Sequence, residues 1–578
     1  MTLMCDMLNI RIRHTLFRLL SIVALWCGLQ PCAFSQSSDH DFELARQLDI
    51  FANVYTQLDM YYVDTLQAKT QIEGAIAEML STIDPYTVYY PEQRRDELLQ
   101  FVSGRYAGIG ISFRVNDATR RAEIIVVERD SPAEKAGLRI GDQILRIDNH
   151  DVGQAASTSN DDKKEYTLAL SQRLRGEPGS SIDIEVMHYG QNRAKSITIY
   201  RQLITQKSIP FAAMLSDSIG YVRLMAFNEN TPDELRSAVA TLKHRGAQKL
   251  ILDLRDNPGG TLLAAVRSVA LFVPRETEVV RTRGRNRLRP DEVHATDVEP
   301  IDEFIPIAIV VDDGTASAAE ITAGALQDYD RGVVIGRRTY GKGLVQSTYE
   351  LPYGGLLKLT SARFYIPSGR CIQALDYSRR TPSGDPMPLP DSLTQAFLTS
   401  AGRTVYDGGG ITPDILVETD TVPQIVGALM QSDVFYDYVA NYVTHHHTID
   451  TPLKFQLTDA EYTAFKKAVI TSRFEFGSST RKALEYAQRI AHDEGFGQDF
   501  DAEIGAITAR LSAEPDRLLE RWRLPVKRAL EHAIVGAYYG AAGQVEYSLQ
   551  ADKDITESIR VLREDRRYRS ILTTAPER

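Results

Sequence analysis

A serine and the helix that follows it form the first stretch of this 578-residue chain that could carry out nucleophilic chemistry. Ser317 follows an apolar strand candidate at 305–311 and the turn at 312–314, and it lies where a helix is expected to begin. Such a serine presents its hydroxyl at a sheet edge, and the free N–H groups of the first helical turn, including that of Ala318, face whatever it attacks. The same position also suits a simple helix N-cap, with Glu320 completing a capping box.

Two glycine-rich stretches could supply the remaining parts of such a site. Lys342 stands between Gly341 and Gly343, with Gln346 four residues later, and flanking glycines hold a lysine in a constrained position close to other backbone. Gly259-Gly260 ends a buried strand candidate, and such a turn can direct a backbone N–H into a cleft as a second oxyanion donor. A tight hairpin around Lys342 and an ordinary strand-to-helix turn at the glycine pair are the alternatives.

Strands alternating with helices surround these stretches. The apolar strand candidates are 219–224, 249–254 and 305–311, and the helix candidates are 231–243, 262–272 and about 317–329. Nearly continuous apolar strands are typical of a sheet buried on both faces, and the alternation favours stacked β/α units. The sequence therefore predicts a β/α core over residues 204–420.

Residues 103–203 have a different character, with short β-rich runs separated by turns. The loop Gly108-Ile109-Gly110-Ile111, followed by "SPAEKAGLRIGDQILRIDNHDV", resembles a PDZ domain. In that fold the backbone N–H groups of the loop bind the terminal carboxylate of a peptide, and the extended peptide pairs with the next strand. The polar segment 155–166 is expected to be a loop insertion before a helix at 166–174. A small β domain that only spaces its neighbours is the alternative.

The regions on either side are expected to be helical. Apolar residues recur every three or four positions within 36–102, and the segment 421–578 contains several helix candidates, one of them starting at a capping box of Thr458 and Glu461. No motif in the last region suggests chemistry. The triplet at 445–447 is three histidines, but adjacent residues do not share a helix face, which favours a solvated loop over a metal site.

Together the three chemical stretches resemble the carboxyl-terminal processing, or tail-specific, protease family. The segments "EGAIAEMLSTIDPYT", "DLRDNPGGTL", "TASAAEI", "YGKGLVQ", "ARFYIPSGRCIQ" and "GGGITPDI" occur in the family's order within residues 40–420. By that resemblance Ser317 is the nucleophile, Lys342 is the general base and Gln346 orients Lys342. The N–H groups of Ala318 and of the Gly259-Gly260 turn would form the oxyanion hole. Asp312 departs from the asparagine that the family often has there and adds a negative charge.

The resemblance implies a multidomain α+β protein. We expect a signal peptide (1–35), an N-terminal helical segment (36–102), a PDZ domain (103–203), a crotonase- or Clp-like serine protease core (204–420) and a C-terminal helical domain (421–578). It also implies an endopeptidase that cleaves polypeptides with accessible C-termini near those termini. A neutral lysine can serve as the base, so no Ser-His-Asp triad is needed. No metal or nucleotide motif is present, so neither a metal nor another cofactor is expected.

The first residues predict export, with an uncleaved anchor or an accidental apolar N-terminus as the alternatives. Three arginines precede a short apolar run at 19–29, and Ala33-Phe34-Ser35 matches a signal peptidase site before Gln36. Cys32 lacks the small preceding residue of a lipidation site. Cleavage there leaves Cys371 as the single cysteine of the mature chain, which excludes an internal disulfide. The protein is therefore expected to be periplasmic or secreted, without a membrane span in the mature chain.

Composition narrows the remaining classes. Hydrophobic residues make up 43% of the chain, which argues against a mainly disordered protein, and the net charge of -11 comes from interspersed acids and bases. Without a basic patch, a nucleic-acid binder is disfavoured. Two alternatives to the protease remain: a non-enzymatic periplasmic PDZ receptor on an inactive protease scaffold, and a crotonase-type acyl-CoA enzyme.

Overall fold

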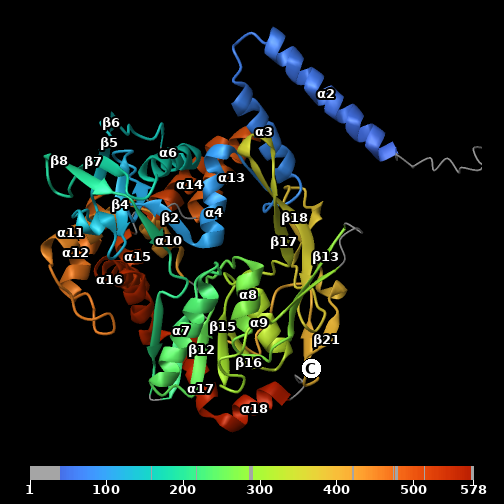
Figure 1. The fold of residues 1–578 in the computed structure, drawn as a ribbon. Coiled ribbons are helices and arrows are strands. Elements are labelled where there is room, and N and C mark those ends of the chain that lie inside the picture. The colour runs from blue at the N-terminus through green and yellow to red at the C-terminus, as the bar shows by residue number, and fades with distance from the viewer. Residues whose placement is uncertain are drawn as a thin grey trace, which may run out of the picture. The chain divides into compact units, whose positions relative to one another are not determined.

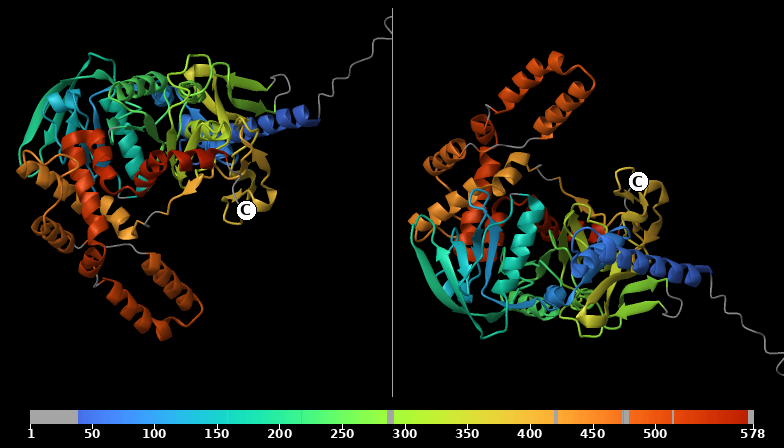
Figure 2. Two further views of the ribbon diagram at one scale, coloured as in Figure 1. Left: turned by 90° about the horizontal axis from the view of Figure 1, so that it is seen from below. Right: turned by 90° about the horizontal axis from the view of Figure 1, so that it is seen from above.

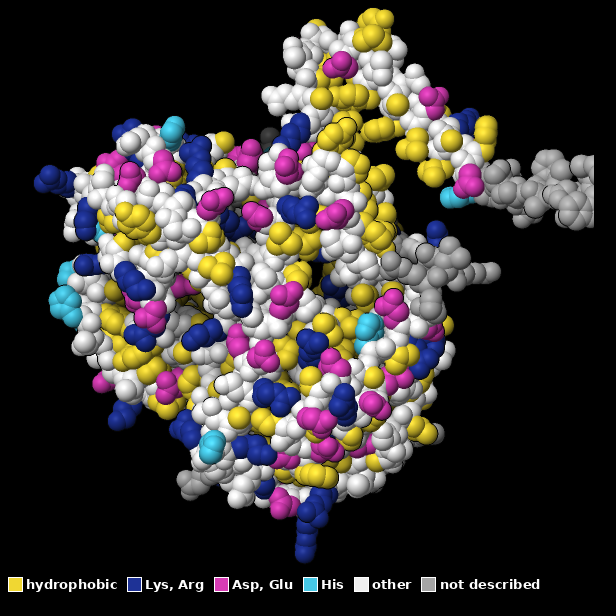
Figure 3. Space-filling model, viewed as in Figure 1, with side chains coloured by type: hydrophobic (Ala, Val, Ile, Leu, Met, Phe, Trp, Pro, Cys, Tyr) yellow, Lys and Arg dark blue, Asp and Glu magenta, His cyan; other side chains and the backbone are white. Residues whose placement is uncertain are grey.

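The computed structural model describes residues 39–573 except 158, 217, 286–290, 419–421, 473, 475–478 and 513–514. The predicted signal segment 1–35 lies outside the described residues. The chain divides into two compact units after Thr82. In the first unit, the helices are α2 (Asp39–Tyr61) and α3 (Ala68–Ser81). The side chains of Phe42, Phe51 and Val54 on α2 are exposed. Figure 3 shows apolar side chains along the surface of this helix.

The second unit begins with a short irregular region and then the PDZ-like sheet. Before that sheet come β1 (Val88–Tyr90), η1 (Glu92–Arg94), α4 (Arg95–Ser103) and β2 (Arg105–Gly108). The prediction of helix throughout 36–102 is therefore wrong at residues 88–90. These residues are β-favouring Val-Tyr-Tyr, and they pair antiparallel with a strand more than 250 residues away, at Leu356–Lys358. Such a long-range pairing has no local signal in the sequence.

The PDZ-like sheet has the order β3-β4-β5-β7-β8, with β6 paired to β5. Its strands are β3 (Ile111–Val115), β4 (Ala122–Val127), β5 (Gln143–Ile147), β6 (His150–Asp151), β7 (Ser181–Met187) and β8 (Ala194–Tyr200). Its helices are α5 (Pro132–Lys135) and α6 (Asn160–Leu174). The expected loop insertion is thus partly helical, because the Ser159 side chain caps α6 by accepting a hydrogen bond from the Asp162 N–H. The strand β9 (Gln202–Thr205) returns antiparallel to β2.

The central sheet of the core has the order β10-β11-β12-β15-β16-β23. Its strands are β10 (Phe211–Met214), β11 (Ile219–Arg223), β12 (Lys249–Asp253), β15 (Ile307–Val311), β16 (Gly332–Gly336) and β23 (Ile415–Leu416). All pairs are parallel except β10 with β11. Parallel strands place their carboxyl ends at one edge, where ligands of open α/β sheets bind. The loops after β12, β15 and β16 carry the predicted site residues.

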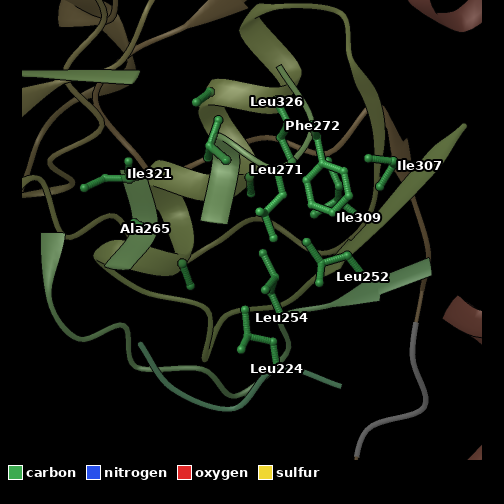
Figure 4. Packing of buried hydrophobic residues seen from close by; sticks show 14 of the residues in the cluster. Leu224, Leu252, Leu254, Ala265, Leu271, Phe272, Ile307, Ile309, Ile321 and Leu326 are labelled. Atoms are coloured by element: carbon green, nitrogen blue, oxygen red, sulfur yellow. The ribbon is translucent and has the colours of Figure 1, made fainter. Parts of the chain in front are cut away.

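Helices cover both faces of this sheet, as buried parallel strands require. One face packs against α7 (Thr231–His244), α8 (Leu262–Val269) and α9 (Ala318–Asp328), and Figure 4 shows side chains of that cluster such as Leu252 and Ile309. The alternate residues Ile251 and Val310 face the other side. That side is covered by the last helices of the chain, α17 (Lys553–Arg563) and α18 (Asp565–Thr573) (Figure 1). The C-terminal segment therefore completes the core.

The strand that follows the lysine loop belongs to a second sheet. The sheet has the order β1-β18-β13-β14, with β17 also paired to β18. Its remaining strands are β13 (Glu278–Gly284), β14 (Glu292–Ala295), β17 (Leu344–Glu350) and β18 (Leu356–Tyr365). The smaller elements are the hairpins β19 (Leu375–Arg380) with β20 (Pro386–Pro388) and β21 (Ala396–Leu398) with β22 (Thr404–Tyr406), and the turns η2 (Pro352–Gly354), η3 (Asp391–Leu393) and η4 (Leu549–Ala551).

The C-terminal helices that precede α17 share a hydrophobic core of their own, apart from those within residues 479–512. They are α10 (Gln424–Met430), α11 (Asp433–His445), α12 (Asp459–Thr471), α13 (Ser479–Asp493), α14 (Gly497–Ser512), α15 (Pro515–Arg521) and α16 (Arg523–Ser548). The predicted capping box of α12 is confirmed, with Thr458 and Glu461 bonded reciprocally. Helices α13 and α14 form a projecting hairpin (Figure 2). Among the described helices, none combines the length and apolar character needed to cross a bilayer.

Candidate active site

Ser317 lies at the N-cap of α9, directly after the loop that follows β15. Its backbone has φ 56° and ψ -115°, a region that non-glycine residues rarely adopt. Backbone strain of this kind persists only where surrounding contacts impose it, and it occurs preferentially at functional sites. The helix-start geometry expected from the sequence is therefore present, but in a strained form that a simple N-cap does not require.

The Glu320 carboxylate joins the serine loop to the lysine loop. Oε2 accepts hydrogen bonds from the N–H of Ser317 at 2.8 Å and of Lys342 at 2.9 Å, and Oε1 accepts one from the N–H of Gly341 at 2.7 Å and one from the Thr339 hydroxyl. The side chain is fully buried, and burial raises the pKa of Glu320 above its usual value. One buried carboxyl group thus joins the backbones of the predicted nucleophile and the predicted base.

The Lys342 amine is partly buried and lies over an aromatic ring. Its Nζ is 4.2 Å from the centroid of the Tyr86 ring. The pKa of Lys342 is lowered to about 8, chiefly by burial and also by the positive charge of Lys358, while the carboxylates of Asp84 and Glu320 oppose the shift. A lysine with this pKa is partly neutral near physiological pH and can accept a proton.

The Gly259-Gly260 turn lies directly against Ser317. A Cβ atom at Gly259 would be 2.8 Å from the Cβ of Ser317 and 2.8 Å from the amide nitrogen of Ala318, so only glycine fits. The Gly259 N–H donates to Oδ1 of Asn257 at 2.9 Å and is therefore occupied. Within the part of the chain that the structure describes, the N–H groups of Gly260 and Ala318 donate to no protein acceptor. These two amides are the donors available for an oxyanion.

Gln346 and Asp312 make hydrogen bonds that the sequence does not indicate. The Gln346 amide nitrogen donates to the Thr360 hydroxyl at 3.2 Å on the neighbouring strand β18, and among the described residues it has no hydrogen bond with Lys342. The buried Asp312 carboxylate accepts hydrogen bonds from the N–H of Asp256 at 2.9 Å and of Gly314 at 3.1 Å. The extra negative charge of Asp312 therefore stabilises two loops of the site, and burial raises its pKa.

The predicted peptide-binding loop connects β2 to β3. Gly110 has φ 83°, which favours glycine, and a Cβ there would lie 2.4 Å from the Cβ of Ser131. Ile109 is buried in the PDZ core, so only its backbone can face a peptide. In the described sheet β3 pairs only with β4, which leaves one edge of β3 for an added strand. Gly108 and Ile111 flank the loop at the ends of β2 and β3.

Sequence reasoning missed three contributors to the lysine environment. Tyr86 and Asp84 belong to the "DPYT" segment, which was interpreted only as part of the family resemblance, and Lys358 belongs to β18. Asp84 accepts hydrogen bonds from the N–H of Tyr86 and of Thr87, both at 2.7 Å, and so shapes this segment. The one signal in the sequence for a contact with Lys342 is an aromatic residue, Tyr86, directly after the turn-forming pair at 84–85.

Metal ligands do not gather at this site or elsewhere in the described ranges: no group of three histidine, cysteine or acidic side chains has the geometry to hold an ion. Among the three histidines at 445–447, His445 ends α11 and His446 stacks on Tyr442.

Comparisons with known sequences match three regions of the chain. The model for "Peptidase family S41" matches residues 218–377, the model for "PDZ domain" matches 107–199, and "Probable PDZ-protease, C-terminal helical domain" matches 425–562. The carboxyl-terminal-processing protease of Synechocystis is 35% identical over 326 residues, which are 55% of this chain and 72% of that protein. That of Bartonella bacilliformis is 31% identical over 371 residues, covering 63% and 82%.

Fold and site together define a serine peptidase with a PDZ domain. The chain belongs to the C-terminal processing protease family of S41 peptidases. Among solved structures, the photosystem II D1 C-terminal processing protease is 26% identical, covers 64% of this chain and 88% of its own, and has a TM-score of 0.34. Neither a non-enzymatic receptor nor an acyl-CoA enzyme receives support from these matches.

Proposed function

We propose that this protein is an exported endopeptidase that cleaves polypeptides near their C-termini with a Ser317/Lys342 dyad. The observation that carries the proposal is the shared carboxylate of Glu320, which binds the backbone N–H of both residues. The glycine turn packed against Ser317 and the lowered pKa of Lys342 support the same assignment.

The proposed mechanism uses groups of this chain and water. The neutral Lys342 amine takes the proton of the Ser317 hydroxyl while Oγ attacks the carbonyl carbon of the scissile amide. The N–H groups of Gly260 and Ala318 bind the oxygen that becomes negative. The protonated lysine then gives its proton to the leaving amine, which departs and leaves an acyl-serine. Lys342 next deprotonates a water molecule, which hydrolyses that ester and restores the serine.

The PDZ domain would select the substrate tail. Its loop at 108–111 offers backbone N–H groups to a free α-carboxylate, and the open edge of β3 offers a strand pairing. Gln346 and the Gly259 amide have indirect parts in this proposal: Gln346 positions the lysine strand by bonding to Thr360, and Gly259 positions the turn by bonding to Asn257.

The test is cleavage of a denatured polypeptide with a free or an amidated C-terminus, with the products identified by mass spectrometry. We expect cuts near the free C-terminus, slower cleavage of the amidated form, and no cleavage by Ser317→Ala. Ser383→Ala, a change at an exposed serine between β19 and β20, is the matched control and should retain full activity. Undiminished activity of Ser317→Ala would contradict the proposed nucleophile.

Export is tested separately. Its support is the arginine-rich start, the short apolar run and the small residues before Gln36. Sequencing the N-terminus of the protein recovered from its native host should give a chain that begins at or near Gln36. Recovery of the intact N-terminus from the cytoplasm would contradict export and leave the proteolytic assignment unaffected.

A further inference from the structure

A cluster of buried charges lies at the end of β12, close to the proposed oxyanion donor Gly260. The Arg255 guanidinium binds Asp253, with Nη2 2.7 Å from Oδ2 and Nε 3.0 Å from Oδ1. It also binds two carboxylates from the C-terminal region: Nη2 is 2.7 Å from Oδ2 of Asp552, and Nη1 is 3.0 Å from Oδ2 of Asp554. Arg255 therefore connects the catalytic sheet to the N-terminus of α17.

The backbone at Arg255 leads directly into the oxyanion turn. The Arg255 N–H donates to Oδ1 of Asp253 at 3.1 Å, and the next residue, Asp256, has φ 52°, in the left-handed region. The Asp256 N–H is held by Oδ1 of Asp312 at 2.9 Å. Because a strained residue stays in place only when its neighbours fix it, anchoring the Arg255 side chain helps to fix the path of residues 256–260.

Stability alone does not account for this cluster. Buried ion pairs contribute little net stability, since desolvation offsets their attraction. Here Oδ1 of Asp554 and Nε of the neighbouring Arg223 are buried without a hydrogen-bond partner in the described part of the chain, which is unfavourable for folding. A cavity of about 550 Å³ adjoins the cluster and is lined by both the sheet and the C-terminal helices, beside the point where Ile555 of α17 packs into the core.

We infer that Asp552 and Asp554 are positioning residues for catalysis: through Arg255 they hold the 256–260 turn so that the Gly260 N–H points at the oxyanion. The inference rests on the proposed function of Gly260. Both aspartates lie in the region matched by the C-terminal helical domain, beyond the S41 peptidase match that ends at residue 377. The peptidase thus takes part of its active-site support from another domain.

The experiment compares full-length Asp552→Asn, Asp554→Asn and the double variant with wild type. Asparagine keeps the shape of each side chain, and at 552 it can still cap α17 by accepting from the Ile555 N–H. The matched control is Asp565→Asn. Asp565 of α18 pairs with Lys249 at 2.7 Å, which joins the C-terminal helices to the opposite end of the same strand β12.

Four measurements are needed: kcat and KM for a peptide with a free C-terminus, the Kd of a substrate-like peptide aldehyde, the pH profile and the thermal unfolding temperature. The aldehyde adds reversibly to the serine hydroxyl and places an anionic oxygen in the oxyanion hole. We expect each aspartate variant to lose about 10- to 100-fold in kcat and in aldehyde affinity. KM should change less than about threefold, and the pH midpoint should stay at the wild-type value.

The outcomes separate this inference from the proposed function. The positioning role of Asp552 and Asp554 is overturned if both single variants keep the wild-type kcat. It is also overturned if kcat falls but the aldehyde binds as tightly as it does to the wild type. An equal loss of kcat in Asp565→Asn also overturns the positioning role, because the loss would then come from a weaker contact between the C-terminal helices and the sheet in general. If Ser317→Ala itself remains active, the proposed function fails. The single variants decide the matter if the double variant does not fold.

Discussion

Replacing Lys358 by methionine and Asp84 by asparagine should move the pH profile of cleavage in opposite directions. With a pKa of about 8, about a tenth of Lys342 is neutral at pH 7, whereas an ordinary lysine has fewer than one neutral amine in about a thousand. The cleaving form needs the neutral amine. In the wild type kcat/KM should therefore rise with pH and level off above about 8.

Each variant changes one charge that acts on Lys342. Lys358→Met removes a positive charge that disfavours protonated Lys342, so the pKa of Lys342 should rise and activity at pH 7 should fall. Asp84→Asn removes a negative charge that favours the protonated form, so the pKa should fall and activity at pH 7 should increase. Asparagine can still accept the N–H groups of Tyr86 and Thr87. Below the midpoint, each pH unit of displacement changes the rate about tenfold.

The assay is kcat/KM for a peptide substrate between about pH 6 and 10. Lys358→Arg keeps the positive charge and serves as the control, with a profile like that of the wild type. Lys342→Arg should be nearly inactive because a guanidinium stays protonated. Three results would refute the assignment of Lys342 as the base. The first is displacement of both pH profiles in the same direction, and the second is a midpoint near 6.5 in every protein. The third is substantial activity in Lys342→Ala.

Three further predictions concern the oxyanion turn, the PDZ loop and the sheet face that α17 covers. Gly260→Ala should lose most activity, because the new Cβ would lie 1.8 Å from the Phe227 carbonyl oxygen, whereas Gly427→Ala, in open space on α10, should be neutral when assayed in parallel. Gly110→Ala should raise KM for free-acid substrates and leave kcat unchanged, as measured by steady-state kinetics, because it strains the loop at φ 83°. Leu562→Ala should destabilise the protein by about 2–5 kcal/mol in chemical denaturation, since it removes a buried side chain of α17 from the sheet.

Local patterns in the sequence predicted most of the fold. The strands expected at 219–224 and 249–254 and the helix after Ser317 were placed correctly, because apolar periodicity and turn residues determine such elements locally. The strand at 88–90 and the packing of α17 on the core sheet were not predicted. Both depend on partners hundreds of residues away, and the sequence near them contains no sign of those partners.

The candidate site also has parts that the sequence predicts and parts that only the structure shows. The pairing of Ser317 with Lys342 is implied by the family resemblance of short motifs, and the structure adds that Glu320 accepts hydrogen bonds from the backbone N–H of both. The side chain of Asn257 accepts a hydrogen bond from the Gly259 N–H. This bond decides that the Gly260 amide, and not that of Gly259, is available for an oxyanion. Hydrogen-bond choices of this kind depend on distances of tenths of an ångström, and residue spacing carries no information about them.

The contact between Arg255 and Asp554 joins residues 299 positions apart. During synthesis, a ribosome delivers the serine, lysine and glycine segments long before residue 554 leaves the exit tunnel. Until then one face of the catalytic sheet is uncovered and the oxyanion turn lacks its anchor. A nascent or prematurely terminated chain would therefore hold all its reactive groups without the geometry to use them, and proteolysis would begin only when translation has passed the last helices.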